Sequence, residues 1–171
     1  MKGAIFFSGK YGSTEQYAKW IGEATGLPIF DIKDTHADPS KYDFLLLGSS
    51  VLYFKLTIRK WAKANLSKLN SRSKILFSVS GAGASAKLNR WVEDSLPPGL
   101  FSQIEHVALP GRLDHSKLSW WLRNILWIGS LLNPDPQARK EERRGFDYMD
   151  KTSIEPLIKM IQRYQTTQAT S

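Results

Sequence analysis

The chain lacks several residue patterns that define large classes of protein. It has 171 residues and no cysteine, which excludes disulfide staples, thiol catalysis and cysteine-ligated zinc or iron–sulfur sites. Its three histidines, His36, His106 and His115, are too widely spaced for a metal motif. No apolar run reaches the roughly 18 residues that a membrane-spanning helix needs. Residues 1–7 are too short for a signal peptide, so we expect a cytoplasmic protein.

What the chain does have is an excess of positive charge. It carries 24 Lys and Arg against 16 Asp and Glu, a formal net charge of +8 at pH 7. The excess is spread along the chain, which fits a nucleic acid, an anionic membrane surface or an anionic ligand. The sequence contains no zinc-finger, RRM or KH signature and no basic recognition helix, so we expect no nucleic-acid partner.

Short apolar runs alternate with helical patterns along most of the chain. Five runs have the length and continuity of buried parallel strands: 2–7, 28–32, 42–47, 74–79 and 104–109. Helical periodicity follows at 17–24, 58–66, 87–95 and 153–164. This alternation predicts one α/β domain over residues 1–171, with a doubly wound five-stranded parallel sheet and helices on both faces.

Three segments that follow predicted strands are rich in glycine and serine, and ligands of doubly wound sheets bind at the carboxyl ends of strands. The first, Ser8–Thr14, opens a helix, whose free N–H groups and dipole favour a phosphate. The alternative is a tight turn in which Ser13 or Thr14 simply caps the helix. The segment has neither the Walker A pattern nor G-x-G-x-x-G, which argues against a P-loop nucleotidase and a dinucleotide site.

The other two segments suggest how a flat ring could be held. Gly48–Phe54 sets Tyr53 and Phe54 beside small residues, where they would either contact a ring system or cap the edge of the core. Ser78–Ser85 has no side chain large enough to block a ligand, so its backbone amides can reach the edge of a heterocycle.

The first segment resembles the FMN-phosphate loop of flavodoxins, T-x-T-G-x-T. Gly12 and Thr14 match that pattern, while Gly9 and Tyr11 stand where it has threonines. The chain resembles more closely the flavodoxin-like, menaquinone-dependent protoporphyrinogen dehydrogenases of haem biosynthesis. That resemblance covers nearly the whole chain. The matching residues are Phe7-Ser8 to Thr14, Tyr42-Asp43, Gly48, Ser50, Tyr53 and Gly111-Arg112-Leu113. An apolar, basic insertion at about 115–145, which includes Arg139-Lys140-Glu141, matches as well.

The resemblance implies a flavodoxin-like fold that holds FMN, with the phosphate on residues 8–14 and the ring between the other two segments, against Tyr53. Ser8, Lys10 and Ser13 would compensate for the two missing threonines, or the fold has lost FMN. The cofactor-binding residues implied are Ser8, Gly9, Lys10, Tyr11, Gly12, Ser13, Thr14, Ser49, Ser50, Val51, Leu52, Tyr53, Ser80, Gly81, Ala82 and Gly83.

The insertion contains a tryptophan-rich stretch, 118–132, with the single charge Arg123. A helix there would be apolar on two opposite faces and about 22 Å long, too short to span a bilayer comfortably. Tryptophans near cations suit the lipid headgroup layer. Alternatively, the stretch contacts a partner protein or a second copy of the chain in a homodimer, or it is buried within the domain.

The function that the resemblance implies is oxidation of a porphyrinogen-type tetrapyrrole, with a membrane quinone as electron acceptor, at the inner face of the cell membrane. We expect Arg112, Lys117 and Arg123 to meet the propionates of the substrate, and Trp120 and Trp127 to meet the membrane. His115 is a candidate acid or base, or a structural residue. The alternative function is a flavoprotein that only transfers electrons, although such carriers are typically acidic and this chain is basic.

Overall fold

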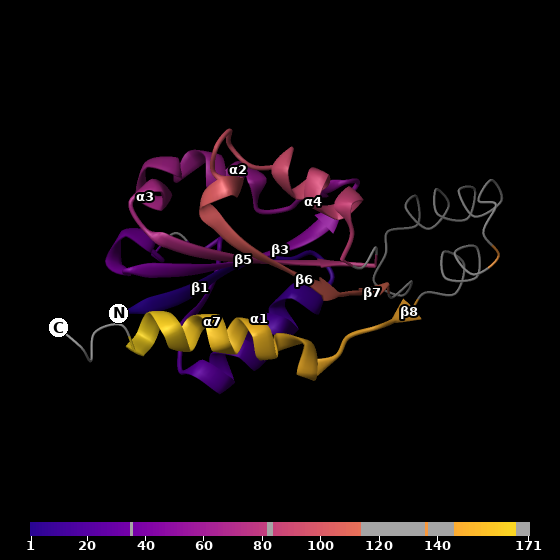
Figure 1. Ribbon diagram of the computed structural model, residues 1–171, viewed down its shortest axis with the longest axis horizontal. Helices are drawn as coiled ribbons and strands as arrows, with labels where there is room; N and C mark the ends of the chain where they lie inside the picture. The colour runs from indigo at the N-terminus through magenta and orange to yellow at the C-terminus, as the bar shows by residue number, and fades with distance from the viewer. Residues whose placement is uncertain (35, 82–83, 114–135, 137–145, 167–171) are drawn as a thin grey trace.

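The fold is built on a central parallel sheet between two layers of helices (Figure 1). The structure is a computed structural model that describes residues 1–34, 36–81, 84–113, 136 and 146–166. The parallel strands pair in the order β2-β1-β3-β5-β6. Their bounds are β1 Gly3–Ser8, β2 Ile29–Asp31, β3 Phe44–Leu52, β5 Ser73–Ser80 and β6 Ile104–Pro110. The doubly wound, five-stranded parallel sheet predicted from the sequence is confirmed.

The apolar runs form strands because both faces of the sheet are covered. Along β3, Phe44 and Leu46 belong to one core, while Leu45 and Leu47 belong to the other. All four side chains are fully buried. Successive residues of a strand point to opposite faces, so a continuous apolar run is what a doubly covered strand requires.

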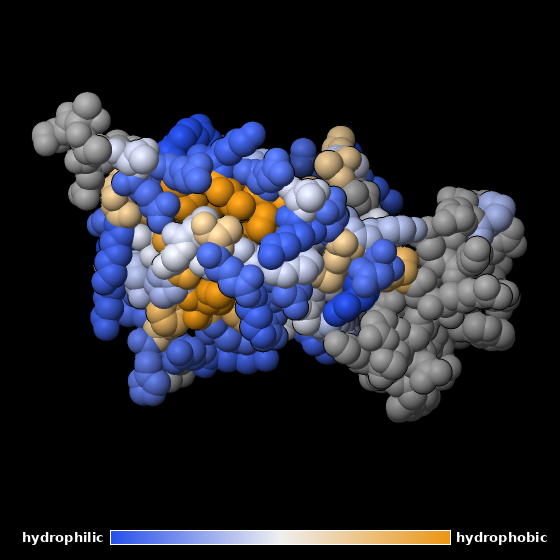
Figure 2. All heavy atoms as spheres, turned by 90° about the horizontal axis from the view of Figure 1, so that it is seen from below, coloured by the Kyte–Doolittle hydropathy of each residue, from blue (hydrophilic) through white to orange (hydrophobic). Residues whose placement is uncertain are grey.

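Different helices cover the two faces (Figure 1). Helices α1 (Ser13–Thr25) and α7 (Glu155–Thr166) pack on the first core and lie below the sheet. Helices α2 (Arg59–Ala64), α3 (Leu66–Asn70) and α4 (Ala86–Glu93) pack on the second core above it. Seen from below, apolar atoms show between the polar side chains on the face that carries α7 (Figure 2).

Two predicted elements differ from the structure. The single helix expected over 58–66 is wrong, because α2 ends before Asn65, whose backbone (φ −108°, ψ 17°) is not helical. The Trp61 carbonyl accepts from both the backbone N–H and the side-chain amide of Asn65 (3.0 Å each), and α3 starts at the next residue. The Gly48–Phe54 segment was expected as a loop, but β3 continues to Leu52 and pairs antiparallel with β4 (Lys55–Leu56).

The remaining elements are short. They are the 3-10 turns η1 (Pro39–Lys41), η2 (Phe101–Gln103) and η4 (Lys151–Ile154) and the strands β7 (Arg112–Leu113) and β8 (Phe146–Asp147). In the part of the chain that the structure describes, no helix is long and apolar enough to cross a membrane. No cluster of three metal-ligating side chains occurs within those residues either. The tryptophan-rich helix predicted over 118–132 lies outside the described residues, as does the insertion around it except for residue 136.

Two polar side chains are enclosed within or beside the sheet. His106 in β6 is partly buried, and its Nε2 lies 2.8 Å from Ser78 Oγ in β5. Burial lowers the pKa of His106 below its ordinary value of 6.5. The Lys74 ammonium donates to the carbonyls of Leu69 (2.9 Å) and Arg72 (2.6 Å) after α3, and burial lowers its pKa as well.

We expect the His106→Gln variant to be less sensitive to acid than the wild-type protein. Because the pKa of His106 is lower in the folded chain, the unfolded chain binds the proton first as the pH falls. The free energy of unfolding therefore declines below about pH 6.5, and the decline ends below the folded-state pKa. Urea unfolding at about pH 8 and about pH 5.5 measures this difference.

The exposed histidine provides the control. A His36→Gln variant should show the same decline with acid as the wild-type protein, because His36 is exposed on a loop. An identical decline in wild type and His106→Gln would contradict the assignment of acid sensitivity to His106.

Candidate functional site

The carboxyl ends of three neighbouring strands meet at one edge of the sheet. In the strand register, Ser8 of β1 lies opposite Ser49 of β3, and Ser50 lies opposite Val79 of β5. The chain leaves β1 toward β2 on one side, while β3 lies on the other, so the winding of the sheet reverses between β1 and β3. Ligands of doubly wound sheets bind beside such a reversal.

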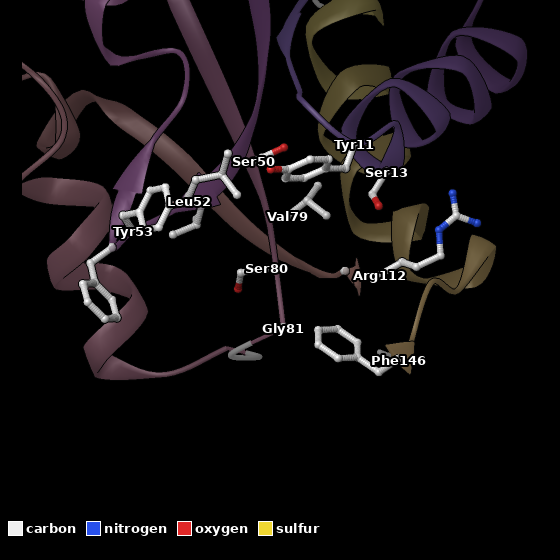
Figure 3. A pocket seen from close by; sticks show the side chains of 13 residues that line it. Tyr11, Ser13, Ser50, Leu52, Tyr53, Val79, Ser80, Gly81, Arg112 and Phe146 are labelled. Carbon is white, nitrogen blue, oxygen red and sulfur yellow. The ribbon is translucent and has the colours of Figure 1, made fainter. Parts of the chain in front are cut away.

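A cavity of about 300 Å³ opens at this edge (Figure 3). Tyr53 lies on one side of it, and Arg112 and Phe146 lie on the other side. A few polar groups among apolar and aromatic side chains are typical of a site for a small organic ligand. The lining residues are Tyr11, Ser13, Ser50, Val51, Leu52, Tyr53, Phe54, Val79, Ser80, Gly81, Gly111, Arg112 and Phe146.

Hydroxyl groups hold the first two segments together beneath the cavity. Thr14 Oγ1 and Ser50 Oγ are 2.7 Å apart, and the Thr57 hydroxyl donates to the Ser8 carbonyl (2.8 Å). Ser49 Oγ lies 3.2 Å from Thr57 Oγ1 and accepts from the backbone N–H of Ile58 (3.2 Å). Thr14 and Ser49 are fully buried, so they position the segments and do not line the cavity.

The N-terminus of α1 faces this edge without a side-chain cap. Gly12 precedes the helix in a left-handed conformation (φ 90°, ψ −15°), which glycine adopts at little cost. The first helical hydrogen bond runs from Gln16 N–H to the Gly12 carbonyl (2.9 Å). The alternative expectation, that Ser13 or Thr14 caps the helix, is therefore wrong, since no side chain makes that bond. Unsatisfied N–H groups and the helix dipole make this end suitable for an anion.

Tyr53 and Phe54 form the two-residue turn of the β3–β4 hairpin. Val51 pairs with Leu56, and Leu52 pairs with Lys55, which leaves only the two aromatic residues between the strands. Both have positive φ (50° and 62°), a conformation that hairpin turns usually assign to Asn and Gly. Side chains of this size pay roughly 1–3 kcal/mol each for it. Strain of this kind, retained at the rim of a cavity, points to a functional role for the turn.

The two turn residues have different surroundings. The Phe54 ring packs on Trp91 of α4, with the ring centroids 4.8 Å apart. Both side chains are exposed at the rim of the cavity, Tyr53 by 58% and Phe54 by 63%. The contact with Trp91 ties Phe54 to α4, so Tyr53 is the ring that we expect to cover a ligand.

The opposite wall is assembled from segments far apart in the sequence. Strands β7 and β8 pair antiparallel and bring Phe146 beside Gly111 and Arg112. Gly81 leaves room for this wall, because a Cβ there would run into the Phe146 ring. Arg112 Nη1 lies 3.6 Å from Asp147 Oδ2, which is a long distance for an ion pair. The Asp147 side chain is more than half exposed. Such pairs bind weakly, which leaves the guanidinium available to a ligand.

The cavity brings together nine of the predicted site residues. Tyr11, Ser13, Ser50, Val51, Leu52, Tyr53, Ser80 and Gly81 line the cavity, as does Arg112, which the sequence assigned to the substrate. Ser8, Gly9, Lys10 and Gly12 lie in the same first segment without lining it. Ala82, Gly83, His115, Lys117, Trp120, Arg123 and Trp127 lie outside the described residues.

Phe54, which the sequence placed beside either a ring system or the edge of the core, also lines the cavity. Three lining residues have no role in the sequence-based site: Val79, Gly111 and Phe146. Adjacency to Ser80 and Arg112 was a usable signal for the first two. Nothing in the sequence pattern marks Phe146, because its place depends on the pairing of β7 with β8.

The ionisable groups among the described lining residues are two tyrosines and one arginine. These groups can bind and orient a ligand, but they supply no redox couple. A phosphate would fit the uncapped end of α1, and a flat ring would fit between Tyr53 and the backbone of Ser80 and Gly81. The described residues therefore fit a flavin nucleotide, whose ring would bring the redox chemistry.

Comparisons with known proteins agree with this geometry. A family model described as a flavodoxin domain matches residues 4–139. No curated protein matches the chain. Among solved structures, the Trp repressor binding protein from Bacillus subtilis is similar, with 13% identity, a TM-score of 0.50, and 87% of this chain and 100% of that chain covered.

Two further solved structures are similar at lower scores. A flavodoxin from the domain Archaea shows 12% identity, a TM-score of 0.41, and 93% and 99% of the two chains covered. A flavodoxin, WrbA-like protein from Agrobacterium tumefaciens shows 15% identity, a TM-score of 0.46, and 68% and 86% covered. The Bacillus subtilis structure supports the fold alone, and the family model spans more than half of the sequence. The chain belongs to the flavodoxin-domain family.

Proposed function

We propose that the protein is an FMN-dependent oxidoreductase. The observation that carries this proposal is one cavity that joins the uncapped N-terminus of α1 to the strained Tyr53–Phe54 turn. The first feature suits a phosphate, and the second suits a flat ring. Membership of the flavodoxin-domain family supports a flavin as the ligand.

The chain's own residues would bind and orient the cofactor. The backbone N–H groups at the start of α1 and the Ser13 hydroxyl would hold the phosphate. Tyr53 would cover the ring, and backbone groups of Ser80 and Gly81 would meet its edge. Bound FMN supplies reversible uptake and release of electrons.

The two threonines missing from the first segment do not prevent this assignment. Thr14 and Ser50 hold each other by a hydroxyl contact of 2.7 Å, so the segment keeps its shape without them. Tyr11 and Ser13 are the hydroxyl-bearing residues of this segment that line the cavity.

For the substrate, we propose a porphyrinogen-type tetrapyrrole, with a quinone as acceptor, as the resemblance to protoporphyrinogen dehydrogenases implies. Arg112 supports this proposal, because it lines the cavity at the side opposite Tyr53 and its contact with Asp147 is long. A guanidinium there suits the propionate of such a substrate. The same proposal includes attachment to a membrane through Trp120 and Trp127, which lie outside the described residues.

We expect FMN-loaded protein to produce porphyrin fluorescence when it is mixed anaerobically with protoporphyrinogen and menaquinone. Arg112→Ala should raise KM about tenfold and leave kcat within about twofold, because a charge-assisted hydrogen bond to substrate contributes about 1.5–3 kcal/mol. Lys159→Ala, an exposed change on α7, is the control. Absence of porphyrin with FMN-loaded protein would sink the dehydrogenase proposal and leave an electron-transfer flavoprotein as the alternative.

The phosphate position can be tested by comparing FMN with riboflavin. Ser13→Asp places a negative charge at the N-terminus of α1 and should weaken FMN binding more than tenfold, while riboflavin binding changes little. Ser13→Asn has nearly the same shape without the charge and is the matched control. Quenching of flavin fluorescence measures both affinities. Equal losses for FMN and riboflavin would place the phosphate elsewhere.

Tyr53→Asn should separate stability from binding. Asparagine tolerates the positive φ of the turn, so the free energy of unfolding should rise by about 1 kcal/mol. Loss of the ring should weaken FMN binding about tenfold, as expected for one aromatic stack. Urea unfolding and flavin titration measure the two effects, and Tyr53→Phe should keep wild-type affinity. Unchanged FMN affinity in Tyr53→Asn would remove Tyr53 from the site.

A further inference from the structure

A long part of the chain has cations and no carboxylates. Between Phe44 and Val92 the sequence holds nine Lys and Arg and not one Asp or Glu. This stretch runs from β3 through α2 and α3 and includes all of α4 except its last residue, Glu93; these are the helices above the sheet in Figure 1. One layer of the molecule therefore carries an unbalanced positive charge.

Three of these nine cations have structural roles. Lys68 pairs with Asp38 at 3.1 Å, and the Arg72 guanidinium donates to the carbonyls of Tyr42 and Ser40 (2.7 and 2.8 Å). Lys74 is buried, as described above. The other six form the surface that we call the basic face: Lys55, Arg59, Lys60, Lys63, Lys87 and Arg90.

The basic face has no internal neutralisation within the described part of the chain. None of its six cations forms an ion pair with a described carboxylate. Arg59 donates only to the Leu56 carbonyl (3.1 Å), and Lys87 Nζ lies 5.2 Å from the centre of the Trp91 ring. These groups keep most of their charge for a partner.

Four cations of the basic face line two clefts, one of which reaches the rim of the cavity. A cleft of about 430 Å³ is rimmed by Arg59, Lys60 and Lys63, and its other lining residues are Leu66, Ser95, Leu96, Pro97 and Pro98. A second cleft of about 340 Å³ shares Arg59 and Lys60 with the first. It also shares Leu52 and Tyr53 with the flavin cavity. Lys55, Arg59, Lys60 and Lys63 thus lie along adjoining clefts that lead to Tyr53.

We propose that the basic face binds a small acidic electron-carrier protein and seats it beside Tyr53. Carboxylates of such a protein would meet Lys60 and Lys63, and an apolar side chain of it would enter the cleft over Leu66 and Leu96. A flat lipid surface cannot enter that cleft, and a sugar–phosphate backbone has no apolar group for its floor. This inference rests on the proposed function: two oxidised one-electron carriers, docked one after the other, would each accept one electron from the flavin that the substrate has reduced, as an alternative acceptor to the quinone, with the protons released to water.

Binding of a plant-type [2Fe–2S] ferredoxin, an acidic carrier, tests the proposal. Calorimetric titration into the full-length, FMN-loaded protein should give a micromolar Kd that weakens severalfold between about 20 mM and about 200 mM NaCl. The Lys60→Glu/Lys63→Glu variant should bind at least tenfold more weakly. Lys33→Glu/Lys159→Glu, with the same change in net charge at exposed positions away from the basic face, should bind like the wild type.

Three results would overturn the proposal: no binding of ferredoxin at low salt, equal losses in the two double variants, or tighter binding of the basic face to anionic vesicles or duplex DNA than to ferredoxin. Docking is also measured on protein without FMN, and flavin affinity is measured separately. Loss of docking with normal FMN affinity refutes this inference alone. Docking without FMN affinity refutes the proposed function and leaves a basic docking face.

Discussion

The Thr57 hydroxyl holds the site together, because it donates to the Ser8 carbonyl and contacts Ser49 in the next strand. With the Thr14–Ser50 contact, it ties the segment after β1 to the end of β3. The parallel register alone would align these strand ends, but it would not set the distance between the loop and the hairpin that follow them. The cavity depends on that distance, since its lining comes from both segments. Buried hydroxyls suit this task, because each can donate and accept.

The hairpin after β3 combines conformational strain with exposed aromatic surface. Folding alone would favour asparagine and glycine at Tyr53 and Phe54, where both backbones have positive φ. The contact of Phe54 with Trp91 offsets part of the cost and fixes the direction of the turn. Tyr53 is thereby held over the cavity before any ligand arrives, and a side chain that is already in place loses less entropy on binding.

Charge divides the molecule into two unlike faces. The helices above the sheet carry six cations and one carboxylate, Glu93, whereas α1 and α7 together carry three of each sign and pair some of them, as Glu15 does with Lys19. The cations behind the formal charge of +8 therefore have different roles. Some form hydrogen bonds within the fold, as Lys74 does, and others lie without an ion pair on the basic face beside the cavity. Electrostatic steering depends on the second part, because only exposed charges on one side create a directed field.

Local signals in the sequence are enough to predict the α/β class, the five parallel strands and the three segments that each contribute residues to the cavity lining. Those features depend on local signals: continuous apolar runs, glycine and serine after a strand, and helical periodicity. Two other features appear only in the folded chain. The strained turn depends on the pairing of β3 with β4, and the Phe146 wall depends on the pairing of β7 with β8. Each of these is a contact between groups whose partners the local pattern does not identify, so only the folded chain could show which groups meet.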